Sequence, residues 1–77
     1  MRYFRLEPGG QTPLHRHSWE HLVRIEKGEG VVYSEHQGKF KVIPGQSVFL
    51  PPDEEHQFLN PYSRSFEFIC VIPNPEK

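Results

Sequence analysis

Four of the five histidines in this chain lie at spacings that suit a single metal site. His15 and His17 are two residues apart, so on an extended strand their side chains point to the same face. His21 follows four residues later, and His56 lies far along the chain, where a folded sheet can bring it back to the other three. Neutral imidazole is the commonest side-chain ligand for divalent transition metals. The pattern therefore predicts one divalent metal ion bound by His15, His17, His21 and His56.

The segments that must position these histidines have the pattern of short strands. Runs rich in Val, Ile, Phe and Tyr alternate with Gly and Pro turns, and no segment keeps the apolar period of a helix over three turns. The predicted fold class is therefore all-β. The expected strands cover residues 2–7, 14–17, 21–26, 31–34, 39–43, 47–50, 56–59 and 65–72.

Side chains alternate along a strand, so the apolar residues of each expected strand indicate its inner face. Around His21 the inner face would also carry Val23, and around His56 it would carry Phe58 and then Asn60. In so small a core Phe58 is expected first of all to fill volume. Asn60 is expected to tie down its turn by side-chain hydrogen bonds rather than to touch a substrate. His36 is placed in an exposed hairpin turn and is given no role.

The last expected strand places the single cysteine of the chain. One of its faces carries Phe66, Phe68 and Cys70, and the opposite face carries Ile69 and Val71. If the first face is the inner one, the thiol of Cys70 lies in or near the pocket, and the other two residues are candidates for a subunit contact. We expect the thiol to act as a small buried side chain, with a pocket thiol that senses a redox metal as the alternative.

Length and charge limit the classes of partner. A chain of 77 residues suits one domain, and at this size a core needs support from a metal or from self-association. The formal net charge of −1, with both signs interspersed, gives no electrostatic footprint for nucleic acid or an anionic membrane. No apolar run spans a bilayer or forms a signal-peptide core. We expect a cytoplasmic homodimer that associates through outward-facing Leu22, Ile69 and Val71.

Two longer patterns resemble the motifs of the cupin superfamily. The first motif, G-x5-H-x-H-x3,4-E-x6-G, is matched by residues 9–28, with His21 where the family usually has Glu. The second motif, G-x5-P-x-G-x2-H-x3-N, is matched by residues 45–60, with Asp53 in place of Gly. Two long motifs in the right order are a specific signal. The chain is therefore identified as a member of the cupin superfamily, and it looks most like small single-domain bacterial cupins with a four-histidine metal site.

The resemblance implies a cupin-type antiparallel jelly-roll barrel that forms a single domain over residues 1–77, with the metal inside near one mouth. Asp53 is a mild departure, because Asp tolerates turn conformations well. His21 in place of Glu leaves the charge of a dication uncompensated, which makes the ion a stronger Lewis acid and a better host for anions. Glu20 is the rival fourth ligand, but both the motif spacing and strand alternation place it one residue off.

The ligand type narrows the choice of metal. Imidazole favours Zn, Cu, Ni or Fe over Mg and Ca, and the resemblance adds Mn. We expect Mn or Fe in the cell, with Zn, Ni or Cu able to occupy the site in purified protein. Four histidines would close a tetrahedral Zn site, whereas a larger octahedral ion keeps two open positions for water, dioxygen or a chelating substrate.

Three functions fit these features. The first is a metal-dependent, dioxygenase-like oxidoreductase acting on a small organic substrate, because no general base stands out beside the ligands and redox or Lewis-acid chemistry needs none. The second is a non-catalytic module that binds a metal and a small ligand. The third is a sugar isomerase, which is disfavoured because the barrel interior lacks an obvious Lys, Arg or Glu for a phosphosugar. The catalytic residues stay unassigned.

Overall fold

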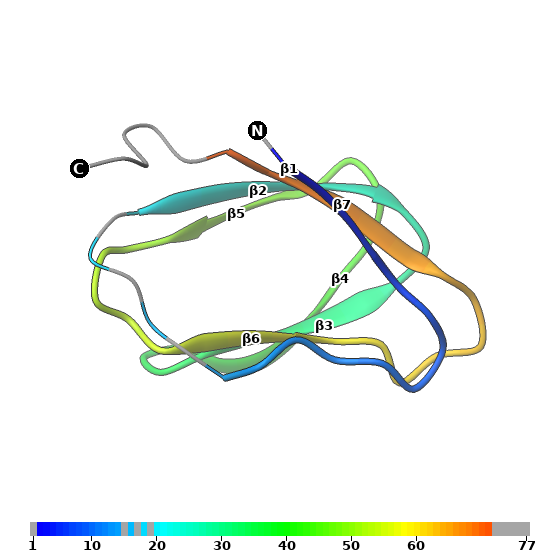
Figure 1. Cartoon of the computed structure of the whole chain (residues 1–77), viewed down its shortest axis with the longest axis horizontal. Coiled ribbons are helices and arrows are strands. Elements are labelled where there is room, and N and C mark those ends of the chain that lie inside the picture. The colour runs from blue at the N-terminus through cyan, green and yellow to red at the C-terminus, as the bar shows by residue number, and fades with distance from the viewer. Residues whose placement is uncertain (1, 15, 17, 19, 72–77) are drawn as a thin grey trace.

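The apolar runs of the chain pair into two antiparallel sheets that face each other across the core (Figure 1). The computed structural model describes residues 2–14, 16, 18 and 20–71. The strands of this part of the chain are β1 (Arg2–Leu6), β2 (His21–Lys27), β3 (Gly30–Ser34), β4 (Gly38–Val42), β5 (Ser47–Leu50), β6 (His56–Leu59) and β7 (Phe66–Val71). The four-stranded sheet has the order β1-β7-β2-β5, and the three-stranded sheet has the order β4-β3-β6.

The predicted all-β fold is confirmed, since the described residues form an antiparallel barrel without helices. It follows that the described part of the chain has no helix able to cross a membrane. Seven of the eight expected strands are present, and their described ends agree with the expected ones to within one residue. Period-two alternation and Gly or Pro turns therefore carried enough information to locate these strands.

The strand expected over residues 14–17 is wrong for the residues described there, because Leu14 and Arg16 lie outside any strand. The pairing with β6 is made further upstream instead. Gly9 N–H donates to the carbonyl of Asn60 at 2.7 Å, and Thr12 N–H donates to the carbonyl of Phe58 at 2.9 Å. Residue 13 is proline, which has no N–H to continue this pairing. The segment 9–12 thus borders β6, and the chain leaves the sheet before the first histidines.

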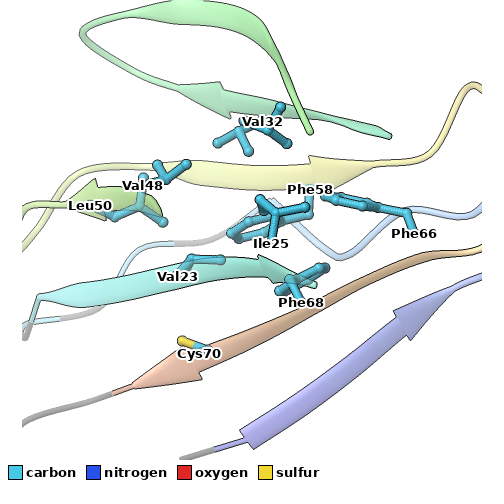
Figure 2. Close-up of a cluster of buried hydrophobic side chains, with 10 residues drawn as sticks. Val23, Ile25, Val32, Val48, Leu50, Phe58, Phe66, Phe68 and Cys70 are labelled. Carbon is cyan, nitrogen blue, oxygen red and sulfur yellow. The ribbon is translucent and has the colours of Figure 1, made fainter. Parts of the chain in front are cut away.

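Apolar side chains from both sheets fill the barrel (Figure 2). The ring of Phe68 from β7 stacks on Phe58 from β6, with centroids 4.4 Å apart, and is also stacked with Phe4 from β1 at 5.3 Å. Burying each such side chain contributes about 1.5–3 kcal/mol. The predicted inner faces of β2, β6 and β7 are confirmed by this core. The buried hydrophobic residues are Val23, Ile25, Val32, Val42, Val48, Leu50, Phe58, Phe66, Phe68 and Cys70.

Two tight turns explain residues that the motifs specify. Gly28 has φ +72°, and a Cβ there would lie 1.9 Å from the carbonyl oxygen of Ser65, so only glycine fits. Asp53, which stands where the second motif has Gly, is the one non-glycine residue with positive φ in the described chain, at 62°. Asp tolerates this left-handed region better than most residues, so the fold keeps the backbone that the motif requires.

Candidate metal centre

Two of the four predicted ligands come together at one end of the barrel. His21 begins β2 in the four-stranded sheet, and His56 begins β6 in the three-stranded sheet. Both side chains point inward and are buried, with 7% and 3% of their surface exposed. Their ring centroids lie 5.1 Å apart. Residues 35 positions apart in the sequence therefore meet across the barrel, as a shared site requires.

The other two predicted ligands, His15 and His17, lie outside the described residues. Among the residues that are described, no three His, Cys, Asp or Glu side chains form a metal-binding group. The structure therefore describes the positions of His21 and His56, and a site of four histidines stays a prediction.

His56 is oriented by a backbone group. Its Nδ1 lies 3.0 Å from the carbonyl oxygen of Glu54, which can only accept, so Nδ1 carries the proton and donates. The lone pair of the neutral ring is then on Nε2. Histidines that bind metals typically donate their second ring N–H to such a carbonyl or to a carboxylate. The ring of His56 therefore has the tautomer that a metal ligand needs.

The side chain of Glu54 fixes the loop that carries this carbonyl. The carboxylate is buried and accepts hydrogen bonds from the hydroxyl of Ser34 and from the backbone N–H of His36 at 3.0 Å. The imidazole Nδ1 of His36 lies 3.2 Å away. The hydrogen bond from Ser34 is the main cause that holds the pKa of the Glu54 carboxyl below its usual value, followed by the His36 N–H. We call these three residues the Glu54 clasp.

The clasp was missed in the sequence, where Glu54 stands in a polar run between Asp53 and Glu55 and has the pattern of an exposed loop. The local sequence indicates only a turn at the preceding residue, Asp53, and does not indicate that Glu54 is buried. His36 is exposed, as predicted, but it does take part in the clasp. The structure therefore adds a buried carboxylate that the sequence did not lead us to expect, in the loop whose carbonyl orients His56.

His21 is oriented by a side chain. Its Nδ1 lies 3.0 Å from the sulfur of Cys70, which is itself buried. The prediction that Cys70 faces the interior is confirmed, and the thiol lies directly behind a predicted ligand. Desolvation by burial is the main cause that raises the pKa of the thiol above its usual value. Cys70 is therefore held as a neutral thiol in an apolar setting, which is not the environment of a reactive thiolate.

Inward-facing His21 and His56, the motif spacing and the barrel itself all point to one family, and residues 2–72 match the sequence family described as the cupin domain. The chain belongs to the cupin family. It is 35% identical over 72 residues to a 1-methylthio-D-xylulose 5-phosphate methylsulfurylase of Rhodospirillum rubrum, covering 94% of this chain and 46% of that protein. It is 34% identical over 78 residues to auxin-binding protein T85 of Nicotiana tabacum, covering 88% of this chain and 42% of that protein.

Solved structures agree with this assignment. The cupin superposes on the polyketide cyclase RemF of Streptomyces resistomycificus with a TM-score of 0.84 and 33% identity, covering 92% of this chain and 51% of that one. The chain thus spans less than half of these curated relatives and about half of this solved structure. The jelly-roll barrel of the cupin type is therefore shown.

Asn60, the last residue of the second motif, closes the opposite end of this cupin. Its side-chain amide donates to the carbonyls of Leu6 at 2.9 Å and Arg64 at 2.7 Å, while its oxygen accepts from the N–H of Tyr62 at 3.1 Å. The prediction that Asn60 ties down its turn is confirmed. A surface cavity of about 540 Å³ lies at that end, away from His21 and His56, and is lined by Gly28, Glu29, Pro44, Tyr62, Ser63 and Arg64. None of these residues is a predicted ligand, and we assign the cavity no role.

Proposed function

We propose that this cupin is a metal-dependent oxidoreductase of the oxygenase type, which acts on a small organic substrate. Its site would consist of one divalent ion held by His15, His17, His21 and His56. The observation that carries the proposal is the pair His21 and His56, because each ring is buried at the same mouth and has its Nδ1 engaged by a second group. Fixing both rings before the ion arrives is what a preorganised ligand set requires.

The chain's own residues would orient the ligands and exclude water. When bound, Mn or Fe would supply Lewis acidity and one-electron redox chemistry. Val23 and Leu50, both buried, and Phe58, whose ring meets His56 edge-on at 6.3 Å, form an apolar floor below the histidines. The carboxylate of Glu54 is engaged in its clasp, where it accepts hydrogen bonds from Ser34 and from the N–H of His36. Chemistry that needs no general base suits this arrangement best.

The relatives support catalysis on small organic molecules, and one of them favours a second candidate. Two of them are named as enzymes, a polyketide cyclase and a 1-methylthio-D-xylulose 5-phosphate methylsulfurylase. The tobacco relative is named for binding auxin. The second candidate is therefore a module that binds a small organic ligand at the metal without turnover.

Metal analysis and oxygen uptake separate these functions. We expect protein purified without added metal to contain about one transition-metal ion per chain, and the metal-loaded protein to consume oxygen with a phenolic or enol substrate. His56→Ala should lose both properties, while Gln37→Ala, in the exposed turn after β3, should keep them. Stoichiometric binding of a ligand without oxygen uptake would establish the binding module instead, and metal-free wild-type protein would contradict both.

A further inference from the structure

The contact between His21 and Cys70 joins a predicted ligand to a buried side chain at the mouth of the barrel. Antiparallel pairing of β2 with β7 sets Cys70 opposite Val23, so the thiol lies next to the inward-facing side chains at the beginning of β2. Figure 2 shows the sulfur at the end of β7 that borders the beginning of β2. Both partners are more than nine-tenths buried, so water does not compete for the 3.0 Å contact.

We propose that Cys70 is a positioning residue for His21: the sulfur accepts a hydrogen bond from Nδ1–H and thereby keeps the lone pair of the ring on Nε2. The inference rests on the proposed function, in which His21 is a metal ligand. A neutral imidazole has one donor and one acceptor nitrogen, and the hydrogen bond made by one nitrogen decides which role the other has. A thiol can accept through its sulfur or donate through its S–H, and the proposal assigns Cys70 the accepting role, which leaves the lone pair of the ring on Nε2 for the ion.

The proposal also explains why His21 needs a hydrogen-bond partner that a glutamate at the same position would not need. The first motif usually has Glu where this chain has His21. An ionised carboxylate presents acceptor oxygens only, whereas an imidazole must be locked into one of two tautomers before it can serve as a ligand. The tautomer of His56 is fixed by the Glu54 carbonyl at 3.0 Å, and the tautomer of His21 is fixed by Cys70.

Packing alone is the competing explanation, because Cys70 also belongs to the hydrophobic core. A thiol that only fills space would leave the ring of His21 to choose its tautomer by other contacts. Val23 provides a matched control, since it is buried beside the same two residues but has no polar atom in its side chain. Val23→Ala removes two buried methyl groups and no hydrogen bond, whereas Cys70→Ala removes one buried sulfur together with its hydrogen bond.

The first test reads the tautomer of the metal-free protein. Long-range ¹H–¹⁵N NMR spectra of the imidazole nitrogens should show His21 protonated on Nδ1 in the wild type and in Val23→Ala. In Cys70→Ala the signal should move toward the Nε2–H tautomer or a mixture, while His56 stays unchanged as an internal reference. Cys70→Ser should restore the wild-type pattern, because its hydroxyl can accept. A wild-type His21 protonated on Nε2, or an unchanged tautomer in Cys70→Ala, would overturn the inference, and the wild-type spectrum alone suffices if the variant does not fold.

The second test measures metal affinity by competition with a chromogenic chelator, using Zn²⁺ and Mn²⁺. Loss of an outer partner of a metal-bound histidine typically weakens binding by 10- to 100-fold, so Cys70→Ala should bind about tenfold more weakly than Val23→Ala. Cys70→Ser should recover most of this loss. Equal affinities of Cys70→Ala and Val23→Ala would overturn the positioning role. A wild type that binds no metal but shows the expected tautomers would instead reject the proposed function and leave the role of the thiol intact.

Discussion

The two sheets of this barrel each provide one buried histidine to the same mouth, but they orient it by different means. The three-stranded sheet holds His56 by a backbone carbonyl, that of Glu54, which no substitution can delete. The four-stranded sheet holds His21 by the side chain of Cys70, which one substitution removes. The orientation of His56 therefore depends on the conformation of the loop at Glu54, and the orientation of His21 depends on the identity of residue 70. Different substitutions should therefore disturb the two histidines.

The outer faces of the sheets differ as well. On the four-stranded sheet the pairing sets Leu22 between Phe49 and Val71, and these three side chains are 48%, 54% and 39% exposed. On the three-stranded sheet the exposed residues of β4 include Lys39 and Lys41. This contiguous row of exposed apolar side chains predicts that the chain self-associates through the four-stranded sheet.

Removing either histidine tests whether the two halves form one site, and it has the largest expected effect. His21→Ala and His56→Ala should each reduce metal affinity by more than the 10- to 100-fold typical of losing an outer partner. Because imidazole binds metal only when neutral, wild-type affinity should fall as the pH is lowered through about 6.5. Metal content by mass spectrometry checks both. Full metal content in His21→Ala together with loss in Glu20→Ala would transfer the ligand role to Glu20.

Breaking the Glu54 clasp should weaken the three-stranded half alone. Glu54→Ala leaves the buried hydroxyl of Ser34 and the N–H of His36 without their acceptor, which should cost about 2–3 kcal/mol in the free energy of unfolding of metal-free protein. Urea denaturation measures this change. Gln37→Ala, at an exposed position in the same turn, should stay within about 0.5 kcal/mol of wild type. Equal losses in the two variants would mean that burial of Glu54 contributes nothing specific.

The same clasp gives a pH dependence with a definite sign. The pKa of the Glu54 carboxyl is lowered in the fold, chiefly by the hydrogen bond from Ser34 and then by the N–H of His36. A lowered carboxyl pKa stabilises the fold above the unfolded value of about 4.3, and this contribution is lost as the pH falls through the folded value. The stability difference between wild type and Glu54→Gln should therefore shrink below about pH 4.3. A constant difference from pH 7 to pH 3 would contradict it.

Local patterns in the sequence were enough to predict the strands and the inward direction of His21, His56 and Cys70. Alternation has a period of two, and a shift of register would have turned each of these side chains outward. The structure does contain an irregularity in β2 between Ile25 and Lys27, but it lies beyond the pair of Val23 with Cys70 and leaves the thiol inside.

Contacts between distant segments could not be predicted in the same way. The Glu54 clasp joins Glu54 to Ser34 and His36, and the sequence of neither segment indicates that the other is its partner. The strand expected over residues 14–17 failed because the pairing of residues 9–12 with β6 is decided by the partner, not by local propensity. The hydrogen bond from His21 to Cys70 likewise follows from the register of β2 with β7.

Charging the apolar row tests whether the outer faces of the two sheets differ in function. We expect the wild type to sediment as a homodimer at micromolar concentration and Leu22→Lys to weaken dimerisation by at least about tenfold, since burying a leucine contributes about 1.5–3 kcal/mol. Tyr33→Lys, at a half-buried position on the other sheet, should leave the dimer intact. A wild type that stays monomeric would reject self-association, and equal dissociation of both variants would reject the choice of sheet.

Oxidation of Cys70 is the subtlest expected difference between the two halves, because only the four-stranded half contains a group that can be oxidised reversibly. Burial raises the pKa of this thiol, so little thiolate is present and peroxide from solution should react slowly. A redox-active ion at the mouth would generate oxidant next to the sulfur, whereas zinc has no redox chemistry. After peroxide treatment, mass spectrometry of the Cys70 peptide should therefore show a few-fold more oxidation in the iron-loaded protein than in the zinc-loaded or metal-free protein. Equal oxidation in the three forms would reduce Cys70 to its packing and hydrogen-bonding roles, because an ion bound by His21 would then have no chemical effect on the thiol that contacts it.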